Sequence, residues 1–244
     1  MAPTLSLLFL TISSLLSSAY CAPAPPRYPD SSSRHTRQVS VQRLQTNQPT
    51  LSLPSNSNVT LQYVALGVGV QNYSCETGAP ESIGAIATLF DITDYLQQKG
   101  RSRVGKHYLQ AYERQTCQAS QNLDDNTCET SINYLDFSVL GHHFFTPVGD
   151  AAAPIFEIYD DQRLLSAQKV GVVPAPARAY DGEEGFGAID WLFLPSDGSQ
   201  RTVGLSEVYR IHTAGGSPDP EGCAAVPAET VLSYKYVAQY WFYS

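Results

Sequence analysis

The chain is short of positive charge, and this shortage limits its partners. Its 244 residues include 15 Lys and Arg against 23 Asp and Glu, a formal net charge of −8. The deficit lies after residue 57, because residues 1–57 carry four Arg and one Asp, a balance of +3, which leaves −11 for the remainder. An acidic domain repels phosphate backbones, so we expect no nucleic-acid partner.

Long apolar runs are also missing, apart from one at the start. Residues 5–16 are uncharged and largely apolar, but they fall short of the about 20 residues that span a bilayer. Ala19-Tyr20-Cys21 follows with the spacing that suits signal peptidase, although the usual basic residue before the run is absent. We expect residues 1–21 to be a signal peptide, and the mature protein to be secreted, extracellular and free of the membrane.

Residues 22–57 contain few large apolar side chains and are rich in Pro, Ser and Gln. Such a segment cannot bury enough surface to offset its ordering entropy, so it is predicted to be a disordered arm. Within it, Arg34-His35-Thr36-Arg37 resembles a minimal processing site with cleavage after Arg37, and an unprocessed linker is the alternative. The domain is expected to occupy residues 58–244.

No amphipathic helix of three turns is apparent in this domain. Residues 203–213 and 232–242 instead alternate in the way that strands do, and turn residues separate the short apolar segments. Gly67-Val68-Gly69 is expected to interrupt the first strand, as a bulge or bend. The pattern predicts a mainly β fold, a single antiparallel β-sandwich or barrel-like domain with long loops and at most short helices.

The cysteines lack the close spacings of a zinc site, so no metal is expected. With Cys21 assigned to the signal peptide, Cys75, Cys117, Cys128 and Cys223 remain, an even number that suits disulfides in an oxidising compartment. Four cysteines allow three pairings. We favour Cys117–Cys128, which closes a short polar loop, and Cys75–Cys223, which ties the start of the domain to its end.

Two sequons suggest glycosylation of the exported protein. They are Asn58-Val59-Thr60 at the start of the domain and Asn72-Tyr73-Ser74 inside an expected strand. Asn58 is the better acceptor, because access to Asn72 in a strand is restricted.

The recognisable catalytic motifs are absent. A dinucleotide site needs a third glycine and a following helix, and strand-like sequence follows Gly67-Val68-Gly69 instead. No G-x-S-x-G elbow of a serine esterase is present. Signal cleavage before Ala22 would not expose the N-terminal histidine of a copper-dependent polysaccharide oxygenase. We therefore expect no cofactor and no NAD-dependent dehydrogenase activity.

Four titratable residues are the weak catalytic candidates. His142 and His143 are adjacent, so on a strand they would point to opposite faces. Asp190 and Glu207 could serve glycosidic hydrolysis if folding held them about 5–10 Å apart. Structural histidines and surface acids are the ordinary alternatives. The chain also has 15 Tyr and 2 Trp, most of which should pack the core, while exposed ones could stack on sugar rings.

Several motifs occur in a familiar order. They are GVGVQNYSC at 67–75, GHHFF at 141–145, AIDWL at 188–192, VYRIHTAGG at 208–216, GC at 222–223 and YWFY at 240–243. Together they resemble an uncharacterised secreted domain family of filamentous fungi and bacteria, which implies a fungal origin. The resemblance makes Cys75 and Cys223 family positions, places Cys117 and Cys128 in a more variable insert, and carries over no catalytic residues. Some members bear the label malate dehydrogenase, which the residues here do not support.

These observations favour a non-catalytic extracellular protein that binds cell-wall polysaccharide or a surface protein. One alternative is a small secreted hydrolase that uses His142 or His143 with a carboxylate. The other is a structural wall or coat protein.

Overall fold

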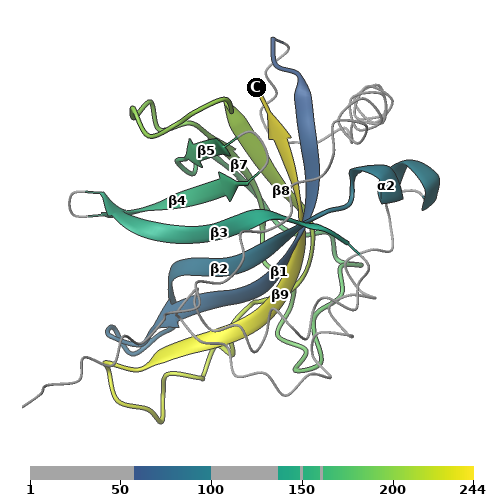
Figure 1. Ribbon diagram of the computed structural model, residues 1–244. Coiled ribbons are helices and arrows are strands. Elements are labelled where there is room, and N and C mark those ends of the chain that lie inside the picture. Colours follow the sequence, from purple (N-terminus) through teal and green to yellow (C-terminus); the bar gives the residue numbers. More distant parts are fainter. Residues whose placement is uncertain (1–57, 100–136, 149–150, 160–161) are drawn as a thin grey trace, which may run out of the picture.

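The computed structural model describes residues 58–99, 137–148, 151–159 and 162–244, which form nine strands and one short helix (Figure 1). The elements are β1 (Leu61–Ser74), β2 (Glu81–Asp91), α2 (Thr93–Lys99), β3 (Val139–Val148), β4 (Ala151–Ile158), β5 (Arg163–Ser166), β6 (Gly171–Val173), β7 (Trp191–Pro195), β8 (Glu207–Gly215) and β9 (Val231–Tyr243). The predicted mainly β, antiparallel fold is confirmed. No helix in these described ranges has the length and apolarity to cross a membrane.

All nine strands belong to one antiparallel sheet in the order β5-β4-β3-β2-β1-β9-β8-β7-β6. The strands at its two edges, β5 and β6, follow each other closely along the chain. The segment between them also pairs with β7, since Ala167 forms a bridge with Ser196 and the Gln168 amide donates to the Pro195 carbonyl at 2.9 Å. The sheet therefore curls back toward itself and is barrel-like, as Figure 1 shows.

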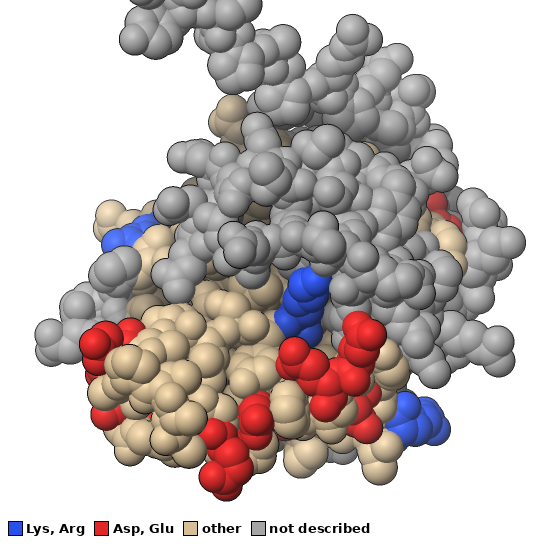
Figure 2. Space-filling view, turned by 90° about the horizontal axis from the view of Figure 1, so that it is seen from below, with Lys and Arg blue, Asp and Glu red and all other residues tan. Residues whose placement is uncertain are grey.

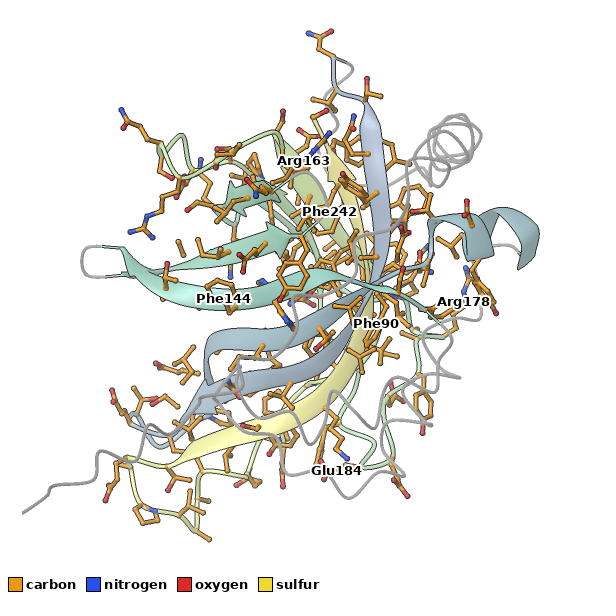
Figure 3. All side chains as sticks on the ribbon, viewed as in Figure 1. Phe90, Phe144, Arg163, Arg178, Glu184 and Phe242 are labelled. Carbon is orange, nitrogen blue, oxygen red and sulfur yellow. A yellow bond between two sulfur atoms is a disulfide. The ribbon has the colours of Figure 1, made fainter. Side chains whose placement is uncertain are left out.

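Both faces of this sheet are covered, which explains why β1 is buried along almost its whole length. Val64 and Leu66 belong to one apolar cluster, and Tyr63 and Ala65 belong to the other. Phe90 lies in the first cluster and Phe242 in the second; both are labelled in Figure 3. The second cluster lines the inner side of the curl, since successive side chains of a strand point to opposite faces.

The expected interruption at Gly67-Val68-Gly69 is wrong, because β1 continues through it with regular pairing to both β2 and β9. The glycines serve close packing instead. A Cβ atom on Gly67 would lie 2.4 Å from Cε2 of Tyr240, and one on Gly69 would lie 1.9 Å from the Ile86 carbonyl oxygen. The missing side chains therefore let the Tyr240 ring and strand β2 approach β1.

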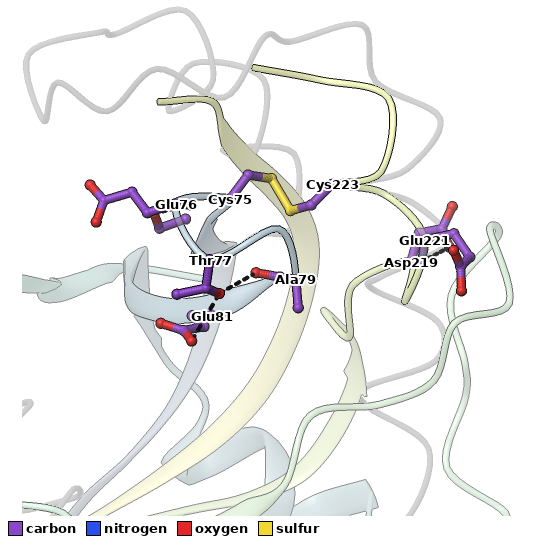
Figure 4. Close-up of a disulfide and its surroundings, with 9 residues drawn as sticks. Cys75, Glu76, Thr77, Ala79, Glu81, Asp219, Glu221 and Cys223 are labelled. Atoms are coloured by element: carbon purple, nitrogen blue, oxygen red, sulfur yellow. Dashed lines mark hydrogen bonds between the residues drawn. A yellow bond between two sulfur atoms is a disulfide. The ribbon is translucent and has the colours of Figure 1, made fainter. Parts of the chain in front are cut away.

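A disulfide joins Cys75, directly after β1, to Cys223 in the loop before β9 (Figure 4). The two residues are 148 positions apart, and the Cys75 amide also donates to the Thr230 carbonyl at 3.1 Å. This is one of the two pairings favoured from the sequence. Cys117 and Cys128 lie outside the described residues, as do residues 1–57, which include the expected signal peptide, the arm and Arg37.

Candidate functional site

The inner side of the sheet opens into a cavity of about 980 Å³, at the upper end of the size range of small-molecule pockets. Much of its lining is apolar. The larger apolar side chains come from strands β2, β3 and β6, from β7 and from the segment just before β7, and they are Ile83, Phe145, Val172, Ile189, Leu192 and Leu194. Gly84 helps to shape it, because a Cβ atom at that position, where φ is +137°, would lie 2.8 Å from Cγ of Phe145.

Arg210 is the charged residue buried in this lining, with 9% of its surface exposed. It projects inward from β8 because it shares a face with Val208 of the inner cluster. Its Nε and Nη2 donate to the Asp190 backbone oxygen at 3.3 and 3.0 Å, and its Nη1 donates to Gln71 Oε1 at 3.3 Å. Both acceptors of these three bonds are neutral oxygens.

The Gln71 side chain, on the inner face of β1, is fixed by its own hydrogen bonds. Its Nε2 donates to the Gly84 carbonyl at 2.6 Å and to Ser82 Oγ at 2.9 Å. These bonds direct the carboxamide oxygen of Gln71 toward Arg210. Strands β1, β2 and β8 thus hold the guanidinium in place before any ligand arrives.

Two tyrosines surround the same charge. Tyr73 lines the cavity and donates its hydroxyl to the Gly216 carbonyl at 2.8 Å; burial raises the pKa of Tyr73 to about 12, against the opposing effect of Arg210. Tyr240 shares a 2.8 Å hydrogen bond with the hydroxyl of Tyr236, and burial raises the pKa of Tyr240, while Arg210 and Tyr236 lower it. Both phenols, Tyr73 in the cavity lining and Tyr240 in the apolar cluster beside it, are therefore uncharged hydroxyls at neutral pH.

His143 is buried on the inner face of β3. Its ring stacks on Phe156, with the centroids 4.1 Å apart and the planes 4° apart, and its Nδ1 lies 2.9 Å from the Ile155 carbonyl oxygen. Burial lowers the pKa of His143 to about 3, and the charge of Arg210 adds to this effect. The imidazole is therefore neutral, and within the described ranges it forms no hydrogen bond with a carboxylate.

His142 does not join His143. It is half-buried and meets the ring of Tyr159 edge-on, at 5.4 Å between centroids and 73° between planes. The alternation of β3 places the two histidines on opposite faces, so they do not share one site.

The structure does not bring Asp190 and Glu207 together either. Asp190 is exposed, lines the cavity and directly precedes β7, whereas Glu207 pairs with Pro195 at the other end of β7. The Glu207 carboxylate accepts a 3.4 Å hydrogen bond from Tyr209, a member of the first apolar cluster. Burial raises the pKa of Glu207, and the bond from Tyr209 opposes that rise.

The two sequon asparagines differ in access. Asn58 is exposed, whereas Asn72 is 7% exposed and its side-chain oxygen accepts a 2.8 Å hydrogen bond from Ser233. Within the described ranges, no group of three or more His, Cys, Asp and Glu residues is placed to hold a metal ion.

Gln71 and Arg210 lie within the segments 67–75 and 208–216 that carry the family resemblance, but those segments assign no role to either residue. One signal in the sequence could have identified Arg210. Arg210 lies two residues after Val208, so on a strand the two side chains point to the same face, and the arginine is expected to be buried with the valine. Arginine is rarely buried unless it is paired, so a buried arginine indicates a binding partner.

The fold and the site define a curled antiparallel β-sheet protein with a ligand-sized cavity that is open to solvent on one side. The chain belongs to the family described as "Protein of unknown function (DUF3455)", whose model matches residues 54–244. The expected membership of an uncharacterised domain family is thereby confirmed. No curated protein and no solved structure matches the chain.

Proposed function

We propose that this protein is a non-catalytic extracellular binding protein that holds a small, partly apolar ligand in the cavity of its curled sheet. The observation that carries the proposal is the cavity of about 980 Å³, which combines apolar walls with a few fixed polar groups. This combination is the usual composition of a small-molecule site. The signal-like segment at residues 1–21 and the Cys75–Cys223 disulfide support an extracellular location.

Two other functions have less support. A glycan-binding surface needs exposed aromatic rings, and Phe186 is the one exposed aromatic side chain in the described part of the chain. A hydrolase needs a proton acceptor whose pKa suits its working pH, and the buried His143 has a pKa of about 3. The cavity therefore favours ligand binding over both.

The test uses 1-N-phenylnaphthylamine, an uncharged dye that fluoresces in apolar surroundings. We expect the secreted protein to bind it saturably near neutral pH. Leu192→Trp, which places an indole in the cavity wall, should weaken binding by about tenfold, because overfilling displaces the dye. Val203→Trp is the matched control, since Val203 is 54% exposed and does not line the cavity.

Failure of the dye to bind, or equal affinity of the Leu192→Trp and Val203→Trp variants, would contradict the proposal. Retention on chitin or glucan without dye binding would instead favour a wall-glycan partner.

A further inference from the structure

We propose that the ligand is a monocarboxylate, whose carboxylate is bound by Arg210 on the buried side of the cavity and whose apolar body extends toward the exposed rim. This inference rests on the proposed function, because it names the chemical class of ligand that the cavity takes. It follows from the charge of Arg210, the donors that remain on it, and the distribution of apolar side chains along the cavity.

The first argument is the burial of a charge without a counter-charge. Arg210 is 91% removed from solvent, and in the described part of the chain none of its hydrogen bonds goes to a carboxylate. Asp190 contacts it through the backbone oxygen, while the Asp190 side chain is exposed. A guanidinium held among neutral oxygens loses hydration without gaining an ion pair. A ligand anion would supply that missing partner.

The second argument is geometric. The bonds to Asp190 and Gln71 occupy three of the five N–H groups of Arg210, and the Tyr240 hydroxyl is a further hydrogen-bond partner, so at least one donor remains for a ligand. The planar guanidinium fork can direct this donor at a carboxylate oxygen. Gln71, which Gly84 and Ser82 hold in place, keeps the fork oriented toward the cavity. The site is therefore organised in advance, which reduces the entropy lost on binding.

The third argument concerns the rest of the ligand. Ile83 and Val172 line the cavity and are 45% and 48% exposed, so the apolar surface continues from the buried wall to the rim. An apolar body attached to the carboxylate would cover these side chains, at a gain of roughly 25 cal/mol for each Å² buried.

The charge of the ligand is limited by its surroundings. Asp190, Asp197 and Lys169 all line the cavity besides Arg210, and acidic side chains also gather on the face of the molecule that Figure 2 shows. The two carboxylates outnumber Lys169, so a second negative charge away from Arg210 would meet a lining that is negative on balance. A monocarboxylate with an apolar chain or ring satisfies both conditions.

The test is competition against bound 1-N-phenylnaphthylamine near neutral pH, with decanoate and 1-decanol as matched competitors. For the wild-type protein we expect decanoate to displace the dye at a roughly 30-fold lower concentration than 1-decanol. This factor corresponds to the lower end of the loss seen when one partner of a buried charge pair is removed. This comparison needs no variant and does not depend on how well a mutant folds.

Arg210→Gln should then abolish the preference for decanoate, which is measured within the variant as the ratio of the decanoate and 1-decanol concentrations that displace half of the dye. Arg163→Gln is the control, because Arg163 is a half-buried arginine that does not line the cavity. Equal displacement by decanoate and 1-decanol in the wild-type protein would overturn the inference and leave the proposed function standing. A preference that survives in a folded Arg210→Gln variant would overturn it too. Absence of dye binding would remove the proposed function itself.

Discussion

The buried His143 should make the protein sensitive to acid, with a slope that the structure sets. Burial lowers its pKa from 6.5 to about 3 in the folded state, so both states are neutral above pH 6.5 and the residue adds no pH dependence there. Below pH 6.5 the His143 imidazole binds a proton in the unfolded chain but not in the folded state. Stability then falls by about 1.4 kcal/mol per pH unit, and the total loss approaches ~5 kcal/mol near pH 3.

The perturbation is His143→Phe, which keeps a flat ring on Phe156 but cannot titrate. Near pH 7 the variant should be less stable by about 1–3 kcal/mol, because the Ile155 carbonyl loses its partner. By pH 4 that deficit should disappear or reverse, since the wild-type protein by then bears a cost of roughly 3 kcal/mol. The assay is urea unfolding at several pH values between 4 and 7.

His142→Phe is the matched control, since His142 is half-buried on the other face of β3, and this variant should retain the wild-type slope. Stability curves that run parallel for wild type and His143→Phe between pH 6.5 and 4 would refute the reasoning. They would mean that His143 accepts a proton in the folded state as readily as in the unfolded one.

Two further predictions concern how the sheet is held together. Replacing both Cys75 and Cys223 by Ala should lower the free energy of unfolding by about 3–5 kcal/mol, because the disulfide closes a loop across 148 positions. Urea unfolding measures this loss, and an unchanged midpoint would contradict the prediction. Gly67→Ala should lower the free energy of unfolding by roughly 1–3 kcal/mol, since the new Cβ would lie 2.4 Å from the buried Tyr240 ring. Thermal unfolding tests this prediction, and a variant as stable as the wild-type protein would show that the ring can move aside.

The alternation of side chains along the sequence predicted the strands well where large apolar residues recur at every second position. In β9 the even-numbered residues from Tyr236 to Phe242 face the inner cluster, as the pattern indicated. It failed at Gly67-Val68-Gly69, where the two glycines predict an interruption but β1 continues. The reason is that a glycine in a strand also marks close approach, and which meaning applies depends on the neighbouring strand. Here the Tyr240 ring occupies the space.

The site could not be predicted because curling assembles it from distant positions. Gln71 and Arg210 are 139 residues apart in the sequence, and the phase of each strand shows only that they share a face with apolar residues. Whether that face is a flat layer against a second sheet or the wall of a cavity depends on the closing segment. Ala167 closes the curl, because its amide donates to Pro154 of β4 and it forms a bridge with Ser196, directly after β7. The local sequence around Ala167 does not predict these two partners.

The same electrostatics that suit the cavity to an anion also bear on the candidate catalytic residues. Arg210 favours negative charge nearby and, after burial itself, is the second factor that keeps His143 neutral. The buried Glu207 carboxylate accepts its hydrogen bond from Tyr209, which is part of the first apolar cluster and lies on the opposite face of the sheet from the cavity. Asp190 remains on the cavity wall, yet its exposed side chain lacks a histidine partner within the described residues. The fixed cation Arg210, beside the uncharged Tyr73 hydroxyl, is therefore the feature of the interior on which the carboxylate proposal depends.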